Sequence, residues 1–422
     1  MLGIIISIIK VVILLGFLIF IHESGHFLVA KLFKVKVLEF AIGFGPTIWS
    51  KQGKETKYAI RLIPLGGFVN MLGEEERSEE QGSYSKASIP KRIGILLAGG
   101  SVNIIFGILV YFILMGTVNS SYISTTIKEV APDYSAEIAG IQVEDKILKI
   151  NEKNIRIKTD VDKILAESNG DNLKILLERD NKKVEVNAEP TKIDTKTIGI
   201  YLGVEGDNLS TEIKSLYKGG PAEQAGIKQG DKIVKVDEIE VNEDAYQAVE
   251  LIQNSPNDKI KITVLRNNED VDFEITPEIS TTYKLGVVFK EINKTFGNAI
   301  YYSFWETINF TGSIVDNLKQ LFTGNVSVNQ LMGPVGISEV VVETKGFQEF
   351  FYILALISLS LGVTNLLPFP PLDGGKVVLL IIEAIRRKPL KENIEVGIQM
   401  AGFVLLIGLS LFVTFNDIVR IF

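Results

Sequence analysis

Four long apolar runs stand out in a sequence that otherwise mixes polar and hydrophobic positions. They span residues 4–33, 93–118, 350–367 and 402–415. A helix needs about 20 apolar residues to cross the hydrocarbon core of a bilayer, so the pattern predicts a polytopic α-helical membrane protein with four transmembrane helices. A cleaved signal peptide is the alternative for the first run, but that run has neither a basic start nor a cleavage site of small residues.

Basic residues gather in two of the loops between these runs. The loop after the first run and the loop between the third and fourth are rich in Lys and Arg, among them Lys34, Lys36, Arg386 and Arg387. Such an excess is typical of cytoplasmic loops. We therefore expect both loops in the cytoplasm and residues 120–293 on the extracytoplasmic side.

Residues 120–293 contain an internal repeat. The stretch AEIAGIQVEDKILKI, which begins at Ala136, matches AEQAGIKQGDKIVKV, which begins at Ala222, at an offset of 86 residues. Each copy has the pattern of a short helix ending at a glycine, then a turn, then a strand with alternating apolar positions. We expect the copies to end in Ile-Gly-Ile at 198–200 and in Leu-Gly-Val at 285–287.

The repeat resembles two PDZ domains in the permuted bacterial arrangement, at residues 120–204 and 205–290. PDZ domains bind an extended peptide at a sheet edge, and an apolar-Gly-apolar loop holds its terminal carboxylate. By this resemblance Gly286 is a candidate for binding substrate in the second copy, whose Gly219 and Gly220 fit the pattern better than the matching residues of the first copy. In the alternative interpretation, both copies are spacers or steric filters that bind no peptide.

Two further segments have patterns of their own. Residues 37–71 are apolar, rich in glycine and too interrupted for a helix, and alternation over residues 57–63 predicts a β-strand. Residues 295–322 interleave aromatic and polar positions. This pattern indicates an amphipathic helix, either on the outer membrane surface or packed on the second copy.

The chain has only two histidines, and both lie in the motif HESGH inside the first apolar run. Positions four apart share one face of a helix, so His22 and His26 can hold one metal ion while Glu23 reaches a water molecule beside it. Zinc suits neutral imidazoles and keeps one position open for water when a third protein ligand is present. Ionisable residues within a membrane span indicate a functional site.

The third ligand has to be a carboxylate, because the chain has no other histidine and no cysteine. Asp373 is the candidate. It follows a proline-rich break at the end of the third run, and non-helical backbone at membrane depth is tolerated where it is buried or lines a cavity. In the alternative interpretation, Asp373 only caps a helix that begins near Gly375.

Charge and composition narrow the function further. The formal net charge is −7, which disfavours nucleic acid as a partner. The absence of cysteine excludes disulfides, thiol catalysis and iron–sulfur clusters. Hydrophobic residues make up 46% of the chain and charged residues 23%, and together these fractions indicate a membrane part joined to an aqueous part.

Four motifs together resemble the site-2 protease family of intramembrane zinc metalloproteases, most closely its regulator-of-sigma-E-protease type with tandem PDZ domains. They are HESGH at 22–26, GFGP at 43–46, PLGGFV at 64–69 and NLLPFPPLDGG at 365–375. The resemblance assigns the zinc ligands to His22, His26 and Asp373 and the general base to Glu23. One departure is Gly100, in the segment AGGSVN, where a proline is commoner in the family.

The same resemblance implies how the rest of the chain is used. Residues 1–118 and 295–422 are expected to form the two halves of the membrane core. Residues 37–71 are expected to form a β-hairpin that dips into the membrane from the cytoplasmic side, and a strand edge at Gly66 and Gly67 is expected to pair with an unwound substrate. A packing role alone is the alternative for this hairpin. Asn365 matches an asparagine that contacts substrate in the family.

The function implied is an intramembrane zinc metalloendopeptidase with one Zn²⁺ per chain, in the inner membrane of a bacterial cell and in contact with its lipid. The expected substrates are transmembrane segments of single-span membrane proteins, either anti-sigma factor-like regulators or remnant signal peptides, cut during regulated intramembrane proteolysis. No nucleic-acid partner is expected. Two rival functions are a metal-ion transporter, which does not need Glu23 or the repeat, and a catalytically silent PDZ scaffold, which does not need the metal ligands.

Overall fold

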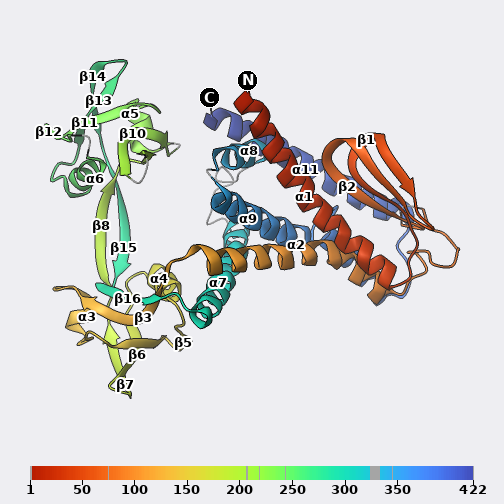
Figure 1. Ribbon diagram of the computed structural model, residues 1–422, viewed down its shortest axis with the longest axis horizontal. Helices are drawn as coiled ribbons and strands as arrows, with labels where there is room; N and C mark the ends of the chain where they lie inside the picture. The colour runs from red at the N-terminus through yellow and green to blue at the C-terminus, as the bar shows by residue number, and fades with distance from the viewer. Residues whose placement is uncertain are drawn as a thin grey trace. The chain divides into compact units, whose positions relative to one another are not determined.

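The computed structural model describes residues 2–74, 76–205, 208–217, 219–242, 244–323, 333–344 and 346–421. The chain folds into two compact units. One, here the membrane unit, comprises Met1–Tyr122 and Asn293–Phe422, and the other, here the PDZ-like unit, comprises Ile123–Ile292. Figure 1 shows the elements of each unit.

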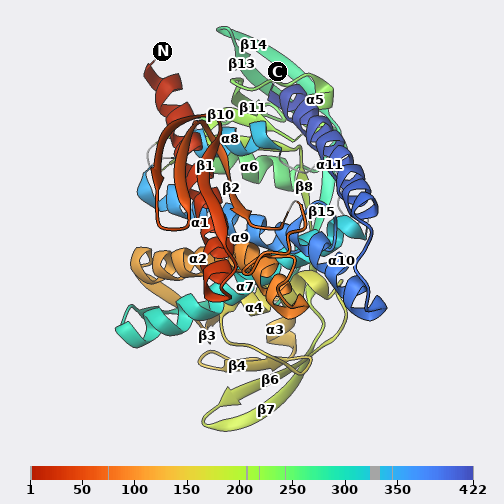
Figure 2. The ribbon, with the colours of Figure 1, turned by 90° about the vertical axis from the view of Figure 1, so that its right-hand side faces the viewer.

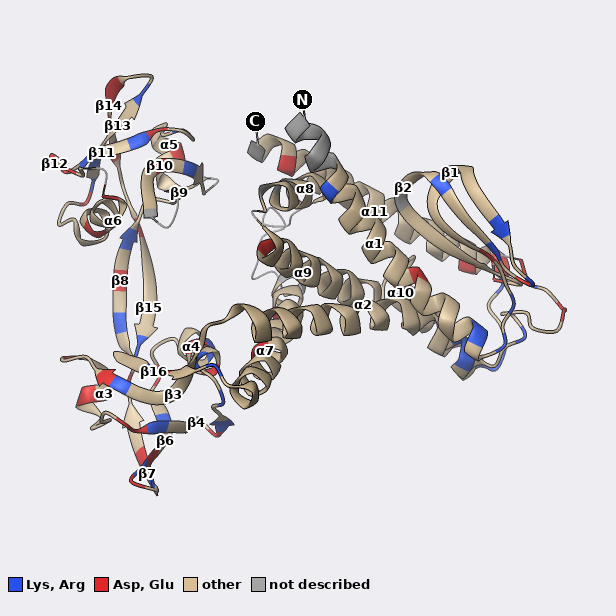
Figure 3. Cartoon of the chain, in the orientation of Figure 1, with Lys and Arg blue, Asp and Glu red and all other residues tan. Residues whose placement is uncertain are grey.

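The membrane unit is mostly helical in the part that the structure describes. Its helices are α1 (Leu2–Leu32), α2 (Ile89–Val118), α7 (Phe296–Phe322), α8 (Pro334–Glu343), α9 (Phe347–Asn365), α10 (Asp373–Arg386) and α11 (Glu392–Ile421). Among the described residues, α1, α2, α9 and α11 are long and apolar enough to cross a membrane. Figure 3 shows few charged residues along α2 and α9. The four expected long apolar helices are therefore present, and the fourth is longer than its apolar run.

Helix α2 packs against α1, α7, α9 and α10. Its contact with α9 is close because glycines face each other: a methyl group on Gly100 would lie 2.9 Å from the carbonyl oxygen of Gly362. Small residues allow the backbones of membrane helices to approach in this way. The glycine that departs from the family pattern at position 100 thus lies within a tight helix crossing.

Helix α7 also packs on α2, through stacked aromatic rings. The rings of Tyr111 and Phe310 stack at 4.1 Å, and those of Tyr122 and Tyr302 at 5.1 Å. The opposite side of α7 exposes apolar side chains, including Phe304. The helix expected over residues 295–322 is therefore present, and it packs on α2 while apolar side chains cover its opposite side.

The segment expected to be a hairpin consists of β1 (Val37–Gln52) and β2 (Lys57–Met71), which pair in one sheet. Ile42 pairs with both Ile60 and Gly67, because each strand bends back and continues the sheet. The bend in β1 falls at Gly43 and Gly45, whose φ angles of 89° and 81° are in the left-handed region that glycine adopts at no steric cost. Figure 1 and Figure 2 show the resulting curved sheet.

The PDZ-like unit holds two copies of a small sheet with helices. Copy one contains β3 (Ser121–Val130), α3 (Ser135–Ile138), β4 (Lys146–Ile150), β5 (Lys153–Asn154), α4 (Lys158–Glu167), β6 (Leu173–Arg179), β7 (Lys182–Ala188) and β16 (Val287–Asn293). Copy two contains β9 (Ile200–Glu205), β10 (Asn208–Leu216), α5 (Pro221–Ala225), β11 (Lys232–Val236), β12 (Ile239–Glu240), α6 (Ala245–Asn254), β13 (Ile260–Arg266) and β14 (Glu269–Ile275). An antiparallel ribbon of β8 (Thr191–Thr197) and β15 (Glu278–Lys284) joins them.

The two copies are nested, whereas the sequence analysis expected them to follow one another. Strand β16 comes after copy two in the sequence but pairs with β3 of copy one. Leu285 belongs to the core of copy one, and Ile198 belongs to the core of copy two. The chain thus leaves copy one along β8, forms copy two, and returns along β15, so the expected division at 204 and 205 is wrong.

The nesting also reassigns the two apolar-Gly-apolar loops. Gly286 accepts a hydrogen bond from the Ala131 amide in copy one at 2.8 Å, so it is not part of copy two. The corresponding loop of copy two is Ile198-Gly199-Ile200, where Gly199 accepts a hydrogen bond from the Tyr217 amide at 2.8 Å. The expected placement of Gly286 in copy two is therefore corrected to copy one.

Each copy contains the same buried ion pair. Asp145 is 1% exposed, and its carboxylate accepts hydrogen bonds from Nε and Nη2 of Arg179 at 2.8 and 2.6 Å. Asp231 is 2% exposed, and its carboxylate accepts hydrogen bonds from Nε and Nη2 of Arg266 at 2.7 and 2.6 Å. Burial alone raises the pKa of Asp231, but hydrogen bonds from Arg266 and from the Lys228 amide outweigh it and hold that pKa below its usual value.

Candidate metal centre

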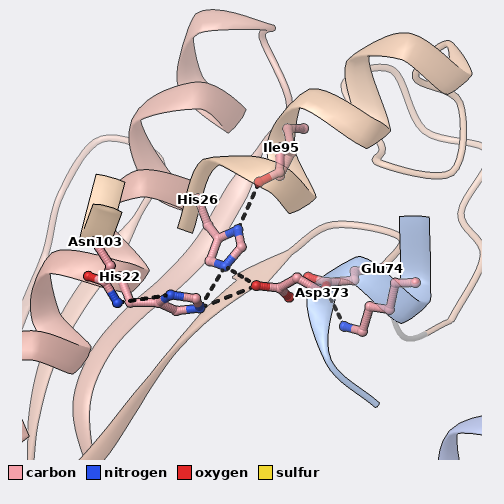
Figure 4. Close-up of polar contacts among 7 residues, drawn as sticks. His22, His26, Glu74, Ile95, Asn103 and Asp373 are labelled. Carbon is pink, nitrogen blue, oxygen red and sulfur yellow. Dashed lines mark hydrogen bonds and ion pairs between the residues drawn. The ribbon is translucent and has the colours of Figure 1, made fainter. Parts of the chain in front are cut away.

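Three candidate metal ligands meet in the membrane unit. Helix α1 carries His22 and His26 one turn apart, and α10 begins with Asp373. Oδ2 of Asp373 lies 3.3 Å from Nε2 of His22 and 3.2 Å from Nε2 of His26, and the two Nε2 atoms are 3.2 Å apart (Figure 4). The structure therefore brings together the three side chains that the sequence analysis named as zinc ligands.

The chain around Asp373 explains how this side chain reaches α1. The proline-rich stretch between α9 and α10 is not helical, and it folds back against the first turn of α10. A methyl group on Gly374 would collide with the carbonyl of Leu366, and one on Gly375 would collide with the backbone at Pro370. The two glycines after Asp373 thus permit the tight bend that aims its carboxylate at the histidines.

The three ligand atoms fit zinc. Atoms bound to zinc at about 2.0–2.1 Å in a tetrahedron lie about 3.3–3.4 Å from one another, close to the observed separations of 3.2, 3.3 and 3.2 Å. Oδ2 of Asp373 is buried, and no described residue gives it a hydrogen bond of good geometry. Leu372, not Asp373, occupies the N-cap of α10, and no side chain caps that helix. These contacts favour a ligand over a helix cap.

Glu23 lies in the cavity that contains the three ligands. This cavity has a volume of about 540 Å³, and residues 68–71 of β2 line one side of it. Glu23 approaches the same strand, since a methyl group on Gly67 would lie 3.2 Å from Cγ of Glu23. The carboxylate therefore shares one chamber with the ligands and with part of the β1–β2 sheet.

Apart from Glu23 and Asp373, the charged residues of this cavity were not predicted from the sequence. Nζ of Lys376 lies 3.4 Å from Oε1 of Glu74, and both residues line the chamber. Arg92, which also lines it, forms an ion pair of 3.0 Å with Glu383. The only available signal was the position of Lys376, which follows Asp373 by three residues on a helix and so shares its face.

Two residues of α2 contact the imidazole rings and were also not singled out. Nδ1 of His26 lies 2.8 Å from the carbonyl oxygen of Ile95. Nδ2 of Asn103 lies 3.5 Å from Nδ1 of His22. Figure 4 shows both contacts on the side of the rings away from Asp373.

The remaining predicted site residues lie at varying distances from this centre. Gly67 adjoins Glu23, as described, and Gly66, with φ of 136°, packs against the ring of Phe44. Asn365 is the last residue of α9, is half-buried, and is not among the residues that line the cavity. Gly286 lies in the PDZ-like unit.

Comparison with known proteins identifies the class of this chain. The profile of peptidase family M50 matches residues 10–409. Zinc metalloprotease RasP of Geobacillus kaustophilus is 32% identical over 99% of this chain and 98% of its own length. Regulator of sigma E protease of Haemophilus influenzae is 30% identical over 97% and 98%, and regulator of sigma-W protease RasP of Bacillus subtilis is 30% identical over 99% of both chains.

Among solved structures, the HtrA3 PDZ domain bound to a phage-derived ligand aligns with 22% of this chain and 93% of its own, at 22% identity and a TM-score of 0.19. The family profile begins within α1 and ends within α11, and it includes His22, His26 and Asp373. The expected enzyme class is thereby confirmed as a zinc metalloprotease. The chain belongs to peptidase family M50, the site-2 protease family.

Proposed function

We propose that this protease cuts transmembrane segments of single-span membrane proteins, with His22, His26 and Asp373 as ligands of one zinc ion and Glu23 as general base. The observation that carries the proposal is that Asp373 of α10 meets His22 and His26 on α1, a helix apolar enough to span a membrane. Ionisable groups within a membrane span are costly and are retained for function. A metal site on α1 would therefore meet its substrate inside the bilayer.

The residues divide the chemistry between them. His22, His26 and Asp373 would hold the zinc ion, which would supply a Lewis acid for the scissile carbonyl and for water. Glu23 takes a proton from the attacking water and delivers it to the leaving amine, which is the role of a general base and then a general acid. The carboxylate of Asp373 would balance part of the positive charge of the zinc ion. His26 is only 7% exposed, so bulk water does not reach the site from the side of this ring.

Substrate binding as an added strand is supported by the pairing of β2. Residues 67–70 pair on one side with residues 39–42, and no other described strand pairs with them. Residues 68–71 also line the cavity of the metal ligands. A transmembrane helix has to unwind before a protease can cut it, and an unwound backbone can pair with this edge. Asn365, at the end of α9, is our candidate for a further substrate contact.

The biological setting follows from the loops and from the relatives. The Lys- and Arg-rich loops support an orientation with these loops in the cytoplasm and the PDZ-like unit extracytoplasmic. The inner membrane of a bacterial cell is the location that we propose. Two relatives are named for control of sigma E and sigma W. These names favour anti-sigma factor-like regulators as substrates, with remnant signal peptides as a second class.

For the PDZ-like unit we propose a filter that excludes substrates with bulky outer domains. Its two ends lie side by side, because Oγ of Ser124 donates to the carbonyl of Lys290 at 2.9 Å. Residues 124–288 can therefore be replaced by a short linker. The shortened protein should cut a trimmed substrate normally and also accept the untrimmed one. If it rejects the untrimmed substrate as strongly as the full chain does, the filter idea is wrong.

The proposed function is tested by locating the bond that is cut. The purified full chain is incubated with a single-span substrate in detergent, and the fragments are analysed by mass spectrometry. We expect a cut inside the apolar segment, and none with the Glu23→Gln variant. A cut confined to the aqueous part of the substrate contradicts cleavage within the membrane segment.

A further inference from the structure

One face of α2 lies against both metal-binding imidazoles. Ile95, Gly99 and Asn103 are spaced four residues apart, so they share this face. The Ile95 carbonyl meets Nδ1 of His26, and the Asn103 amide meets Nδ1 of His22. Between them, a methyl group on Gly99 would collide with the rings of both histidines. This face therefore contacts the histidines from the side opposite Asp373.

The contact with His26 shows what a metal-binding histidine requires. Its Nε2 faces Asp373, so a metal held there leaves the proton of a neutral imidazole on Nδ1. That N–H needs an acceptor, which is the Ile95 carbonyl oxygen at 2.8 Å. Such outer partners fix the tautomer and the orientation of a ligating ring.

His22 has the same requirement, because its Nε2 also faces Asp373. Among the described residues, the group within reach of its Nδ1 is the amide of Asn103, at 3.5 Å from Nδ2. The amide oxygen of Asn103 is buried and has no hydrogen-bond partner there. A half turn of the amide exchanges its oxygen and nitrogen. That turn presents the unpartnered oxygen to the Nδ1–H of His22.

We propose that Asn103 is a positioning residue whose amide oxygen accepts a hydrogen bond from Nδ1–H of His22 and so orients that ring toward the metal. This inference rests on the proposed role of His22 as a zinc ligand. Asn103 is 0% exposed, and its own backbone oxygen accepts a hydrogen bond from Oγ of Ser358 at 2.8 Å. The amide is therefore held against His22 by the packing of α2 on α9.

A packing role alone is the competing explanation, and burial argues against it. A buried amide oxygen without a partner is less stable than a hydrogen-bonded one. An apolar side chain of similar size, such as leucine, fills the same space without this cost. The asparagine is explained when its oxygen has a donor, and the Nδ1–H of His22 supplies one.

The test compares zinc affinities of the full-length protein in detergent, measured by competition with a chromophoric chelator. Asn103→Leu keeps the volume but removes the acceptor, and we expect its affinity to fall about 10- to 100-fold, the usual cost of losing an outer partner of a ligand. Asn103→Asp keeps an acceptor and should bind zinc at least as tightly as the unmodified protein. Ser303→Ala removes a hydroxyl that is just as buried, on α7, and should leave the affinity unchanged.

Cobalt gives a second readout, because its visible spectrum reports ligand geometry. We expect an altered spectrum for Asn103→Leu and a spectrum close to that of the unmodified protein for Asn103→Asp. If Asn103→Leu does not fold, Asn103→Ala replaces it, since removing atoms creates no clash. Equal zinc affinity in the unmodified protein and the variant without an acceptor overturns the inference, as does equal weakening in Asn103→Asp. Loss of cleavage with normal zinc affinities bears on the proposed function instead.

Discussion

Buried aspartates in the two units have different surroundings. In the PDZ-like unit, Asp145 and Asp231 each receive two bonds from an arginine and one from a backbone amide, so their oxygens are satisfied. In the membrane unit, Oδ2 of Asp373 faces two imidazole nitrogens and has no well-formed hydrogen bond from the described residues. A buried carboxylate whose oxygens are hydrogen-bonded to an arginine stabilises a fold. One that is left open beside two histidines has the surroundings of a metal ligand.

Removing the carboxylate at each place separates the two roles most clearly. Asp373→Ala removes one of the three proposed zinc ligands, so zinc content and cleavage should both fall, by at least the 10- to 100-fold that changes to outer partners cost. Metal analysis and a cleavage assay on the same preparation measure the effect. Zinc content equal to that of the unmodified protein would remove Asp373 from the site.

The control for this variant has to be another buried aspartate, and Asp417 is unsuitable. Although Asp417 lies far along α11 from the ligands, it is 1% exposed and accepts a hydrogen bond from the Gly336 amide at 2.8 Å. Its removal is expected to disturb the contact between α8 and α11. Asp231→Asn is the better control, because the PDZ-like unit holds none of the three ligands.

A substitution that creates a cavity in the PDZ-like unit tests the nested arrangement, and it should not change the zinc content. Leu285 is 2% exposed in the core of copy one, so Leu285→Ala should destabilise that copy by about 2–5 kcal/mol. Hydrogen exchange should then accelerate in β4 and β6. Faster exchange confined to β11 and β13 would mean that Leu285 supports copy two, contrary to the pairing of β16 with β3.

Breaking one of the arginine pairs gives a somewhat smaller effect. Asp231→Asn leaves Arg266 without its charged partner, and we expect a loss of about 2–3 kcal/mol in copy two. Zinc content should not change. Exchange rates of the amides in β11 and β13 measure the loss, and a fall in zinc content would break the separation between the two units.

Lowering the pH protonates Asp231 of the Asp231–Arg266 pair, and we expect this to have the smallest effect on stability. The folded pKa of Asp231 lies below its usual value of 3.8, so the unfolded state takes up the proton first as the pH falls. The stabilisation by this carboxylate is therefore complete above about pH 4 and is lost as the pH drops through the folded pKa. The exchange difference between the unmodified protein and Asp231→Asn should be full at pH 6 and should shrink below pH 4.

The parts of the site that depend on local sequence could be predicted. His22, Glu23 and His26 share one helical turn, so their spacing alone indicated the candidate ligands and the candidate base. Asp373 could be named because only a carboxylate remained and a broken helix held it. Ile95 and Asn103 could not, since their role depends on where α2 crosses α1, which no spacing within α2 reveals.

The fold shows the same limit. The apolar runs predicted the four long helices, and the repeat predicted two similar copies. The nesting was missed because Leu285-Gly286-Val287 closely resembles Ile198-Gly199-Ile200. The pairing of β16 with β3 joins residues more than 150 positions apart, and it depends on tertiary contacts that this short local pattern does not reveal.

The central claim is that Glu23 performs the proton transfer beside a zinc ion that other residues hold. Measuring zinc content and cleavage rate on one preparation of Glu23→Gln tests it most directly. We expect one zinc ion per chain, as in the unmodified protein, and a cleavage rate lower by roughly 10²- to 10⁴-fold. Near-normal cleavage, or loss of zinc together with activity, would contradict the assignment of Glu23 as general base.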